Sequence, residues 1–245
     1  MNNKYENYSS VLYDFTKPPG TSIDGDLEFY KNLLMPIEGK VLEAGVGNGR
    51  LLIPFLKYKI DIEGIDKSKS MLEICNKNLA INDLECTLID QDLEHFIKPE
   101  YYEFIIMPNA SFCLLENRQI ALKVLHNFFI SLKSKGSIAI DLILPIEFKK
   151  GSSHSMEHHL PNLNLNVKNY NQEIDWFYQY TINKIEYYDR QTLLETQLVK
   201  LSWYGVEEFK SMLEKIGFKE VYVIKNYNNN KLINLKTITF IAKKD

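Results

Sequence analysis

The chain has 245 residues, of which 45% are hydrophobic and 25% charged, and its formal net charge is −3. This length and apolar content are typical of one large soluble domain, and the slightly acidic balance argues against a nucleic-acid partner. No apolar run approaches the ~18 residues of a membrane span, and the N-terminus has no signal-peptide pattern. The three cysteines, Cys75, Cys86 and Cys113, form no CxxC pair. We therefore expect a cytoplasmic protein with reduced thiols and no membrane partner.

Strand and helix patterns alternate over the first 145 residues. Short apolar runs predict strands at 40–45, 60–66, 86–92, 104–109 and 136–144. Helical spacing predicts helices at 49–57, 68–82 and 118–133, the second of them capped by Ser68. This alternation favours an α/β fold whose parallel sheet is covered by helices on both faces.

The pattern changes after residue 145. A polar stretch extends to about residue 171 and predicts a loop, and the β-branched and aromatic segments 175–188 and 192–204 predict a long antiparallel hairpin. A helix at 206–218 follows. The final apolar segments, 219–227 and 235–244, flank a short polar turn at 228–231, so these strands must pair antiparallel.

Three glycines stand at every second position of VLEAGVGNGRLLIPF, residues 41–55. Gly45, Gly47 and Gly49 fall in the first β–α turn, at the sheet edge where open α/β folds bind ligands. Their spacing differs from the GxGxxG of a dinucleotide site, and Glu43 suits a cationic group better than a phosphate. A tight turn without a ligand is the alternative interpretation.

Acidic residues also end the second and third predicted strands. Asp66 stands where an acid accepts hydrogen bonds from ribose hydroxyls, although it is also placed to cap the following helix. Of the two acids in 90–92, Asp92 is the better candidate to bind an exocyclic amine, because Leu93 and Phe96 follow it at a spacing that covers a base. A purely structural turn is the alternative there.

In this order the motifs resemble class I methyltransferases that use S-adenosylmethionine and act on small molecules. The matching segments are ExGxGxG at 43–49, IDKSKSML at 65–72, IDQDLEHF at 89–96, EFIIMPNASFCLL at 103–115, LKSKGSIAIDL at 132–142, GFKEVYVI at 217–224 and TITFIAKK at 237–244. The resemblance implies a seven-stranded Rossmann-like sheet with an antiparallel last strand. It also implies a single domain over 1–245, in which the loop and hairpin of 146–205 are inserted as a lid.

The resemblance further implies where S-adenosylmethionine is bound. Glu43 and the glycine loop face its methionine part, Asp66 its ribose and Asp92 its adenine. A tyrosine segment near the N-terminus closes over cofactor and substrate, although a packed surface helix is the alternative there. The implied cofactor-binding residues are Tyr13, Glu43, Gly45, Gly47, Asn48, Gly49, Asp66, Lys67, Met71, Asp92, Leu93, Pro108 and Asn109.

We therefore expect methyl transfer to N or O of a small-molecule acceptor by a monomer or homodimer. A base is needed only if the nucleophile arrives protonated, and His95 is better interpreted as a solvated side chain. His154, His158 and His159 lack the spacing of a metal site, so we predict no metal and a mobile loop at 153–159. An NAD-type oxidoreductase and a non-catalytic S-adenosylmethionine-binding protein are the alternatives. No motif identifies a catalytic residue or the acceptor.

Overall fold

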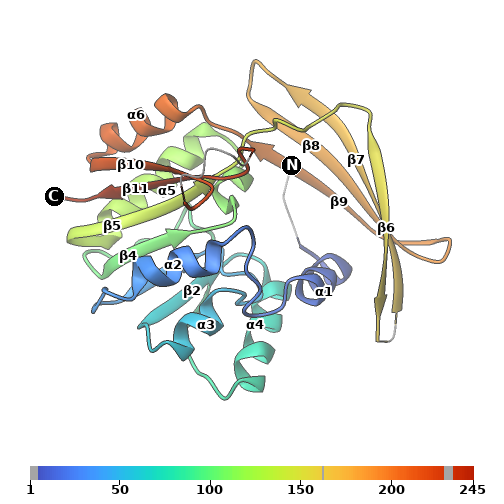
Figure 1. Cartoon of the computed structure of the whole chain (residues 1–245), viewed down its shortest axis with the longest axis horizontal. Helices are drawn as coiled ribbons and strands as arrows, with labels where there is room; N and C mark the ends of the chain where they lie inside the picture. The colour runs from blue at the N-terminus through green and yellow to red at the C-terminus, as the bar shows by residue number, and fades with distance from the viewer. Residues whose placement is uncertain (1–4, 162, 229–233) are drawn as a thin grey trace.

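The computed structural model describes residues 5–161, 163–228 and 234–245 and contains two separate β-sheets (Figure 1). The larger sheet has seven strands in the order β10-β11-β5-β4-β1-β2-β3. Strands β1 to β5 are parallel to one another, whereas β11 is antiparallel to both β5 and β10. The strands are β1 (Val41–Ala44), β2 (Ile62–Asp66), β3 (Leu88–Asp90), β4 (Tyr102–Met107), β5 (Leu132–Leu142), β10 (Lys219–Lys225) and β11 (Ile238–Lys243). The predicted α/β fold with its antiparallel last strand is confirmed.

Helices cover both faces of this sheet. They are α1 (Asn7–Thr16), α2 (Asp26–Leu34), α3 (Leu52–Lys57), α4 (Lys69–Ile81), the 3₁₀ helix η1 (Ser111–Leu114), α5 (Arg118–Ser131) and α6 (Val206–Ile216). Alternate residues of a buried strand point to opposite layers. Phe104 and Ile106 of β4 pack with α2, α3 and α4, whereas Ile105 and Met107 pack with α5 and α6. Helix α2 was not predicted from the sequence.

The smaller sheet corrects the prediction for the inserted segment. It has four antiparallel strands, β6 (Ser153–Leu160), β7 (Leu163–Asp175), β8 (Tyr180–Asp189) and β9 (Thr192–Ser202), in that order. The prediction of a loop to residue 171 was wrong, because β6 and most of β7 lie there. The predicted hairpin is present but shorter, as residues 176–179 form a turn. The predicted turn at 228–231 lies mostly outside the described residues.

The polar composition of strand β6 explains why it was not predicted from the sequence. Residues 153–159 read Ser-His-Ser-Met-Glu-His-His, and most of β6 is exposed because it is an edge strand. Pairing with β7 supplies backbone hydrogen bonds to β6, and this tertiary context overrides its weak strand propensity.

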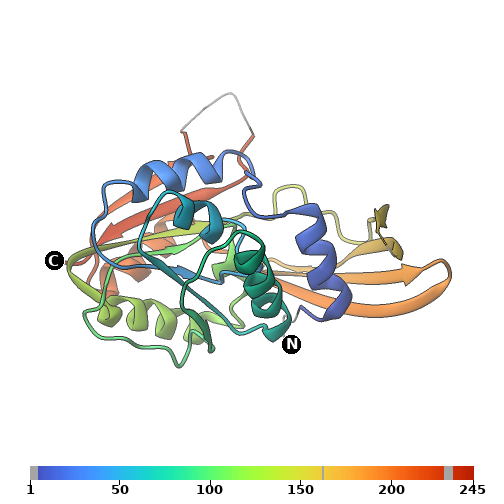
Figure 2. The ribbon, with the colours of Figure 1, turned by 90° about the horizontal axis from the view of Figure 1, so that it is seen from below.

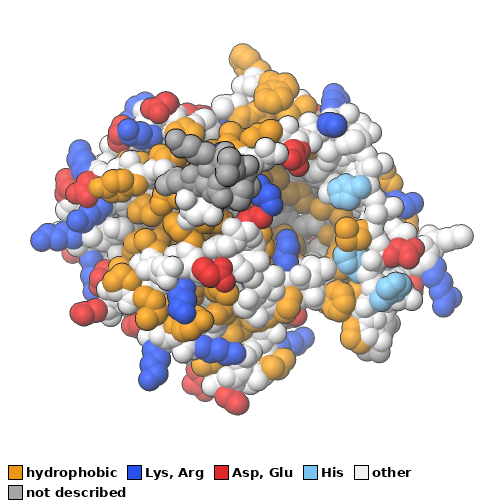
Figure 3. Space-filling view, in the orientation of Figure 1, with side chains coloured by type: hydrophobic (Ala, Val, Ile, Leu, Met, Phe, Trp, Pro, Cys, Tyr) orange, Lys and Arg blue, Asp and Glu red, His pale blue; other side chains and the backbone are white. Residues whose placement is uncertain are grey.

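Helix α1 stands between the body of the molecule and the four-stranded sheet (Figure 2). It contacts both α4 and β9. In the space-filling view the surface is hollowed between the main body and the smaller sheet (Figure 3). Among the described residues, no helix is long and apolar enough to cross a membrane.

Candidate functional site

A cavity lies at the carboxyl ends of β1, β2 and β4. Strand β1 lies between β2 and β4, so the order of the strands in the sheet reverses direction at β1. Such a reversal leaves a crevice between the loops that follow the strands. Most of the residues expected from the sequence lie together on its wall: Tyr13, Glu43, Gly45, Gly47, Asn48, Asp66, Lys67, Met71, Asp92, Leu93, Pro108 and Asn109. Gly49 is not part of this wall.

The glycines of the first β–α turn serve two different purposes. All three have positive φ, +74° at Gly45, +56° at Gly47 and +82° at Gly49, where a side chain is strained. Gly45 and Gly47 face the cavity. A Cβ on Gly49 would lie 2.8 Å from the Cys75 sulfur of α4. Gly49 therefore allows the loop and helix α4 to pack closely.

Asp66 joins the end of β2 to the glycine loop. Its Oδ2 accepts a hydrogen bond of 2.9 Å from Gly47 N, and its Oδ1 accepts one of 2.9 Å from Ser68 N. Burial raises the pKa of Asp66, and these backbone donors oppose that shift. The N-cap of α4 is Ser68, whose hydroxyl accepts from Met71 N at 3.3 Å. Asp66 is thus not the cap, and its remaining lone pairs are available to a ligand at the cavity wall.

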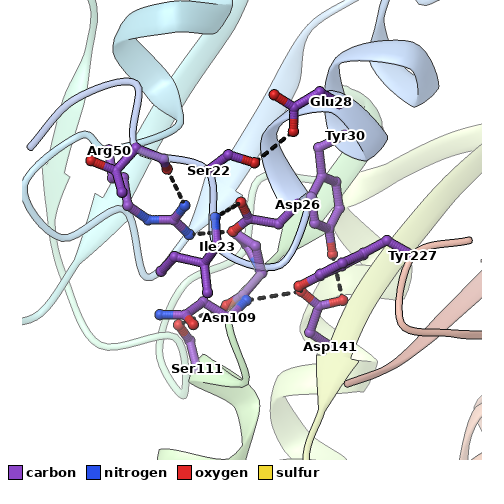
Figure 4. Close-up of polar contacts among 12 residues, drawn as sticks. Ser22, Ile23, Asp26, Glu28, Tyr30, Arg50, Asn109, Ser111, Asp141 and Tyr227 are labelled. Atoms are coloured by element: carbon purple, nitrogen blue, oxygen red, sulfur yellow. Dashed lines mark hydrogen bonds and ion pairs between the residues drawn. The ribbon is translucent and has the colours of Figure 1, made fainter. Parts of the chain in front are cut away.

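Glu43 and Arg50 lie near one another on the cavity wall. Glu43 is 3% exposed, and its buried Oε2 has no hydrogen-bond partner among the described residues. Burial raises the pKa of Glu43 to about 8. Arg50 is held by Asp26 Oδ2 at 2.6 Å (Figure 4). Its guanidinium also donates to the Thr21 carbonyl oxygen at 2.8 Å. An unpaired carboxylate oxygen and an anchored guanidinium suit the ammonium and carboxylate of an amino acid.

Another part of the cavity wall is apolar with an acidic edge. Met71 and Leu93 are buried on its wall, at 3% and 8% exposure. Asp92 accepts from Glu94 N at 3.0 Å, and its Oδ2 lies 3.5 Å from Lys67 Nζ. Phe96 was expected to cover a base at this site. In the structure it is buried in the core and is not part of the cavity wall.

Helix α1, near the N-terminus of the chain, forms part of the cavity wall through Tyr13. The Tyr13 hydroxyl accepts a hydrogen bond of 3.3 Å from Asn109 Nδ2. Asp14 Oδ1 accepts two hydrogen bonds of 2.8 Å, from the side-chain amides of Asn48 and Asn78. Because Asn48 belongs to the glycine loop and Asn78 to α4, Asp14 holds the helix against both.

The same helix is attached to the four-stranded sheet. Glu195 Oε2 accepts from Tyr8 N at 2.7 Å and Ser9 N at 3.2 Å, at the helix N-terminus. Leu12 packs with Leu165 and Tyr187 on the facing side of the sheet. Helix α1 therefore connects the smaller sheet to the cavity.

Several residues of the cavity were not predicted. Most neighbour predicted residues in the sequence, and only Arg50 carried a signal of its own, as a charge directly after the third glycine. Tyr5 had none, because only the docking of the N-terminal segment brings it to the cavity. The unpredicted residues are Tyr5, Val46, Arg50, Ile65, Ser68, Gln91, Met107, Ser111, Leu114 and Leu115.

The histidines lie away from the cavity wall. His95 is exposed, and His154, His158 and His159 lie on strand β6 and not on the mobile loop predicted there. His159 Nδ1 lies 3.0 Å from Asn164 Oδ1. Across the described ranges, no group of three or more His, Cys, Asp or Glu side chains is arranged to hold a metal ion.

Comparison with known proteins identifies a matching domain model and similar folds. Residues 41–136 match the family model described as a methyltransferase domain, while no curated protein matches the chain. Among solved structures, an S-adenosylmethionine-dependent methyltransferase from Clostridium acetobutylicum ATCC 824 is similar, with 16% identity, a TM-score of 0.76 and coverage of 96% of this chain and 97% of that one. The sugar N-methyltransferase KedS8 from Streptoalloteichus sp ATCC 53650 has 13% identity and a TM-score of 0.76, covering 100% and 95%. CalS10, an amino pentose methyltransferase from Micromonospora echinaspora, has 14% identity and a TM-score of 0.72, covering 100% of both chains. At these identities the structural likeness concerns the fold.

Proposed function

We propose that the chain is a class I S-adenosylmethionine-dependent methyltransferase that methylates a nitrogen of a small, hydroxyl-rich amine. The observation that carries the proposal is the cavity whose wall contains Glu43, Asp66 and Asp92, each at or near the carboxyl end of one of the first three strands. Nitrogen is favoured over oxygen because similar folds belong to a sugar N-methyltransferase and an amino pentose methyltransferase. A neutral amine also needs no base before it attacks.

The residues of the cavity fit the proposed cofactor. The unpaired Oε2 of Glu43 is placed to accept from its ammonium group, and the anchored guanidinium of Arg50 to bind its carboxylate. We assign the ribose hydroxyls to Asp66 and the adenine to the apolar part of the wall, between Met71 and Leu93, beside Asp92. When bound, the cofactor supplies a methyl group on a positively charged sulfur.

The protein's part in the reaction is orientation and exclusion of water. Tyr13 of helix α1 lines the cavity together with Pro108 and Asn109, and the Asn109 side-chain amide donates to its hydroxyl. Burial raises the pKa of Tyr13, so its hydroxyl stays protonated at neutral pH. We therefore assign Tyr13 the role of holding the acceptor amine by a hydrogen bond, not of removing its proton.

We assign the acceptor to the inner face of the four-stranded sheet. Asn183 Nδ2 donates to Asn169 Oδ1 at 3.1 Å and to Asn171 Oδ1 at 2.7 Å. Paired and alternate residues share a face of a sheet, so these amides lie on the face of Tyr187 and Glu195 that contacts α1.

These half-buried amides retain capacity for a ligand. Asn169 Nδ2 and Asn183 Oδ1 have no hydrogen-bond partner in residues 5–161, 163–228 and 234–245. Strand β9 also packs against η1, and Ser111 and Leu114 of η1 line the cavity. Neutral amides of this kind pair with hydroxyl groups as both donor and acceptor, which supports a hydroxyl-rich acceptor between the sheet and the cavity.

Thermal shift with S-adenosylmethionine and S-adenosylhomocysteine tests the cofactor assignment. At 100 times Kd, ligand binding stabilises a protein by about 2.7 kcal/mol, which raises the Tm of a chain of this size by roughly 5–10 °C. Asp66→Ala is expected to lose this shift. Asp90→Ala is the matched control, because Asp90 also ends a strand but lies outside the cavity wall. No shift in the wild type contradicts the cofactor assignment.

A panel of amino sugars and the corresponding hydroxyl sugars tests the acceptor. Mass spectrometry is expected to show a gain of one methyl group on amines alone, together with S-adenosylhomocysteine. Asn171→Ala should raise the acceptor KM about 5- to 10-fold and leave the Kd for S-adenosylmethionine unchanged. Methylation of the hydroxyl sugars, or an unchanged acceptor KM in Asn171→Ala, would exclude the corresponding part of the proposal.

A further inference from the structure

A buried carboxylate near the end of β5 joins four parts of the chain. Asp141 is fully buried, at 0% exposure. Its Oδ1 accepts from the Tyr30 hydroxyl of α2 at 2.9 Å and the Thr239 hydroxyl of β11 at 2.7 Å. Its Oδ2 accepts from the Tyr227 hydroxyl, after β10, at 2.8 Å and from the backbone N of Asn109, after β4, at 2.9 Å. Figure 4 shows Asp141 between Tyr30, Tyr227 and Asn109.

The last of these bonds connects Asp141 to the cavity. Asn109 and the next residue, Ala110, have φ of +53° and +56°. Two successive non-glycine residues in this left-handed region cost roughly 1–2 kcal/mol each, so the surrounding structure must hold the turn. Three of the four donors to Asp141 are hydroxyl groups, which can rotate to other acceptors. The N–H of Asn109 has a fixed direction and needs an acceptor where Asp141 Oδ2 lies.

The turn places groups on the cavity wall. Pro108 and Asn109 both line the cavity. The Pro108 carbonyl oxygen accepts from Ser111 N at 3.2 Å and from its hydroxyl at 3.0 Å, which begins η1. The Asn109 side-chain amide donates to the Tyr13 hydroxyl at 3.3 Å. A connected path thus runs from Asp141 through Asn109 to Tyr13 on α1.

We propose that Asp141 is a positioning residue for methyl transfer, whose carboxylate holds the turn at 108–110 so that Asn109 binds Tyr13 at the cavity. The inference rests on the proposed function, in which Tyr13 orients the acceptor. Asp141 touches neither cofactor nor acceptor and acts through Asn109. Its loss should affect kcat far more than binding of the cofactor, because Glu43, Arg50 and Asp66 lie on other elements.

Four single variants and one double variant measure this role. Asp141→Ala is expected to lower kcat by about 10- to 100-fold, as for other small misplacements of a reacting group, with a Kd for S-adenosylmethionine within about threefold of wild type. Asp141→Asn retains a carbonyl oxygen for Asn109 N, so it should restore most of kcat. Thr239→Val removes a donor from the other oxygen of Asp141 and is the control for stability, with kcat unchanged. Asn109→Ala retains the backbone N–H but removes the path to Tyr13, so adding Asp141→Ala to it should lower Tm without a further loss of kcat.

Hydrogen exchange provides a measurement that needs neither an acceptor nor a stable variant. In the wild type, the Asn109 amide is expected to exchange slowly although it lies in a turn, because it donates to a buried carboxylate. In Asp141→Ala, exchange at Asn109 and in α1 should accelerate, whereas Thr239→Val should leave both slow. Rapid exchange at Asn109 in the wild type, equal loss of kcat in Thr239→Val, no rescue by Asp141→Asn, or additive losses with Asn109→Ala each overturn the proposal. If the wild type binds the cofactor but methylates no amine, the proposed acceptor fails and the exchange data still decide the role of Asp141.

Discussion

The charge state of Glu43 should control how tightly the cofactor binds. In the free protein, burial raises the pKa of this carboxyl from 4.5 to about 8. Only the ionised form offers a full charge to an ammonium group. Near pH 7 about a tenth of the molecules carry the ionised form, and near pH 6 about a hundredth. Binding must therefore weaken as the pH falls, and it must release a proton.

The expected size follows from these populations. If the ionised form binds the ammonium and the neutral form contributes little, affinity falls about 50-fold from pH 8 to pH 6, or roughly 2.3 kcal/mol. Glu43→Gln resembles the neutral form at every pH. Its affinity should approach that of the wild type at pH 6 and be much weaker at pH 8.

Isothermal titration calorimetry with S-adenosylhomocysteine measures this directly. Titration of groups on the ligand cancels in the ratio of wild-type to Glu43→Gln affinity. Titrations in two buffers of different ionisation enthalpy should show that the wild type releases about 0.9 more protons than the variant near pH 7. A ratio that stays constant from pH 6 to pH 8, with equal proton release, would refute the assignment of Glu43 to the ammonium group.

The same pKa shift has a consequence for stability. The folded-state pKa of about 8 lies above the usual value of 4.5, so between these values the unfolded chain binds fewer protons than the folded one. Stability contributed by this group therefore falls as the pH rises through that range. Glu43→Gln lacks the titration, and its Tm without ligand should exceed that of the wild type by a margin that widens from pH 5 to pH 8.

Three further predictions concern the loop and helix around the cavity. Gly49→Ala should lower the free energy of unfolding, measured by chemical denaturation, by about 2–4 kcal/mol, because the added Cβ would lie 2.8 Å from the Cys75 sulfur. Gly151 is the control, since it has the same φ of +82° but open space around it. Gly151→Ala should lower the free energy of unfolding by only about 1–2 kcal/mol. Asp14→Ala removes both amide bonds to helix α1 and should weaken its docking by about 2 kcal/mol, seen as roughly 30-fold faster hydrogen exchange in α1; unchanged exchange contradicts this role. Glu195→Gln removes the negative charge from the N-terminus of α1 and should lower Tm by the equivalent of about 1 kcal/mol, whereas an unchanged Tm would show that the charge is not needed.

Local sequence patterns correctly predicted the central parallel strands and the position of the cavity. The apolar runs at 40–45, 60–66 and 104–109 were sufficient for buried parallel strands, and the glycines and acids at their ends for the cavity. This works because parallel strands bring their carboxyl ends to one edge of the sheet. Residues far apart in the sequence, such as Glu43 and Asp92, then line the same cavity without any further information.

The α/β sheet and more than half of the residues around the cavity could thus be predicted from local patterns, namely the period of the apolar residues and the position of the glycines. Folding was needed to show that residues 153–160 and 163–175 form strands, that Asp26 anchors Arg50, and that Asp141 accepts hydrogen bonds from Tyr30, Tyr227 and Asn109. These features consist of hydrogen bonds between segments as many as 111 positions apart. Such bonds leave no periodic trace in the chain, because each polar group is satisfied by a partner that only folding brings within reach.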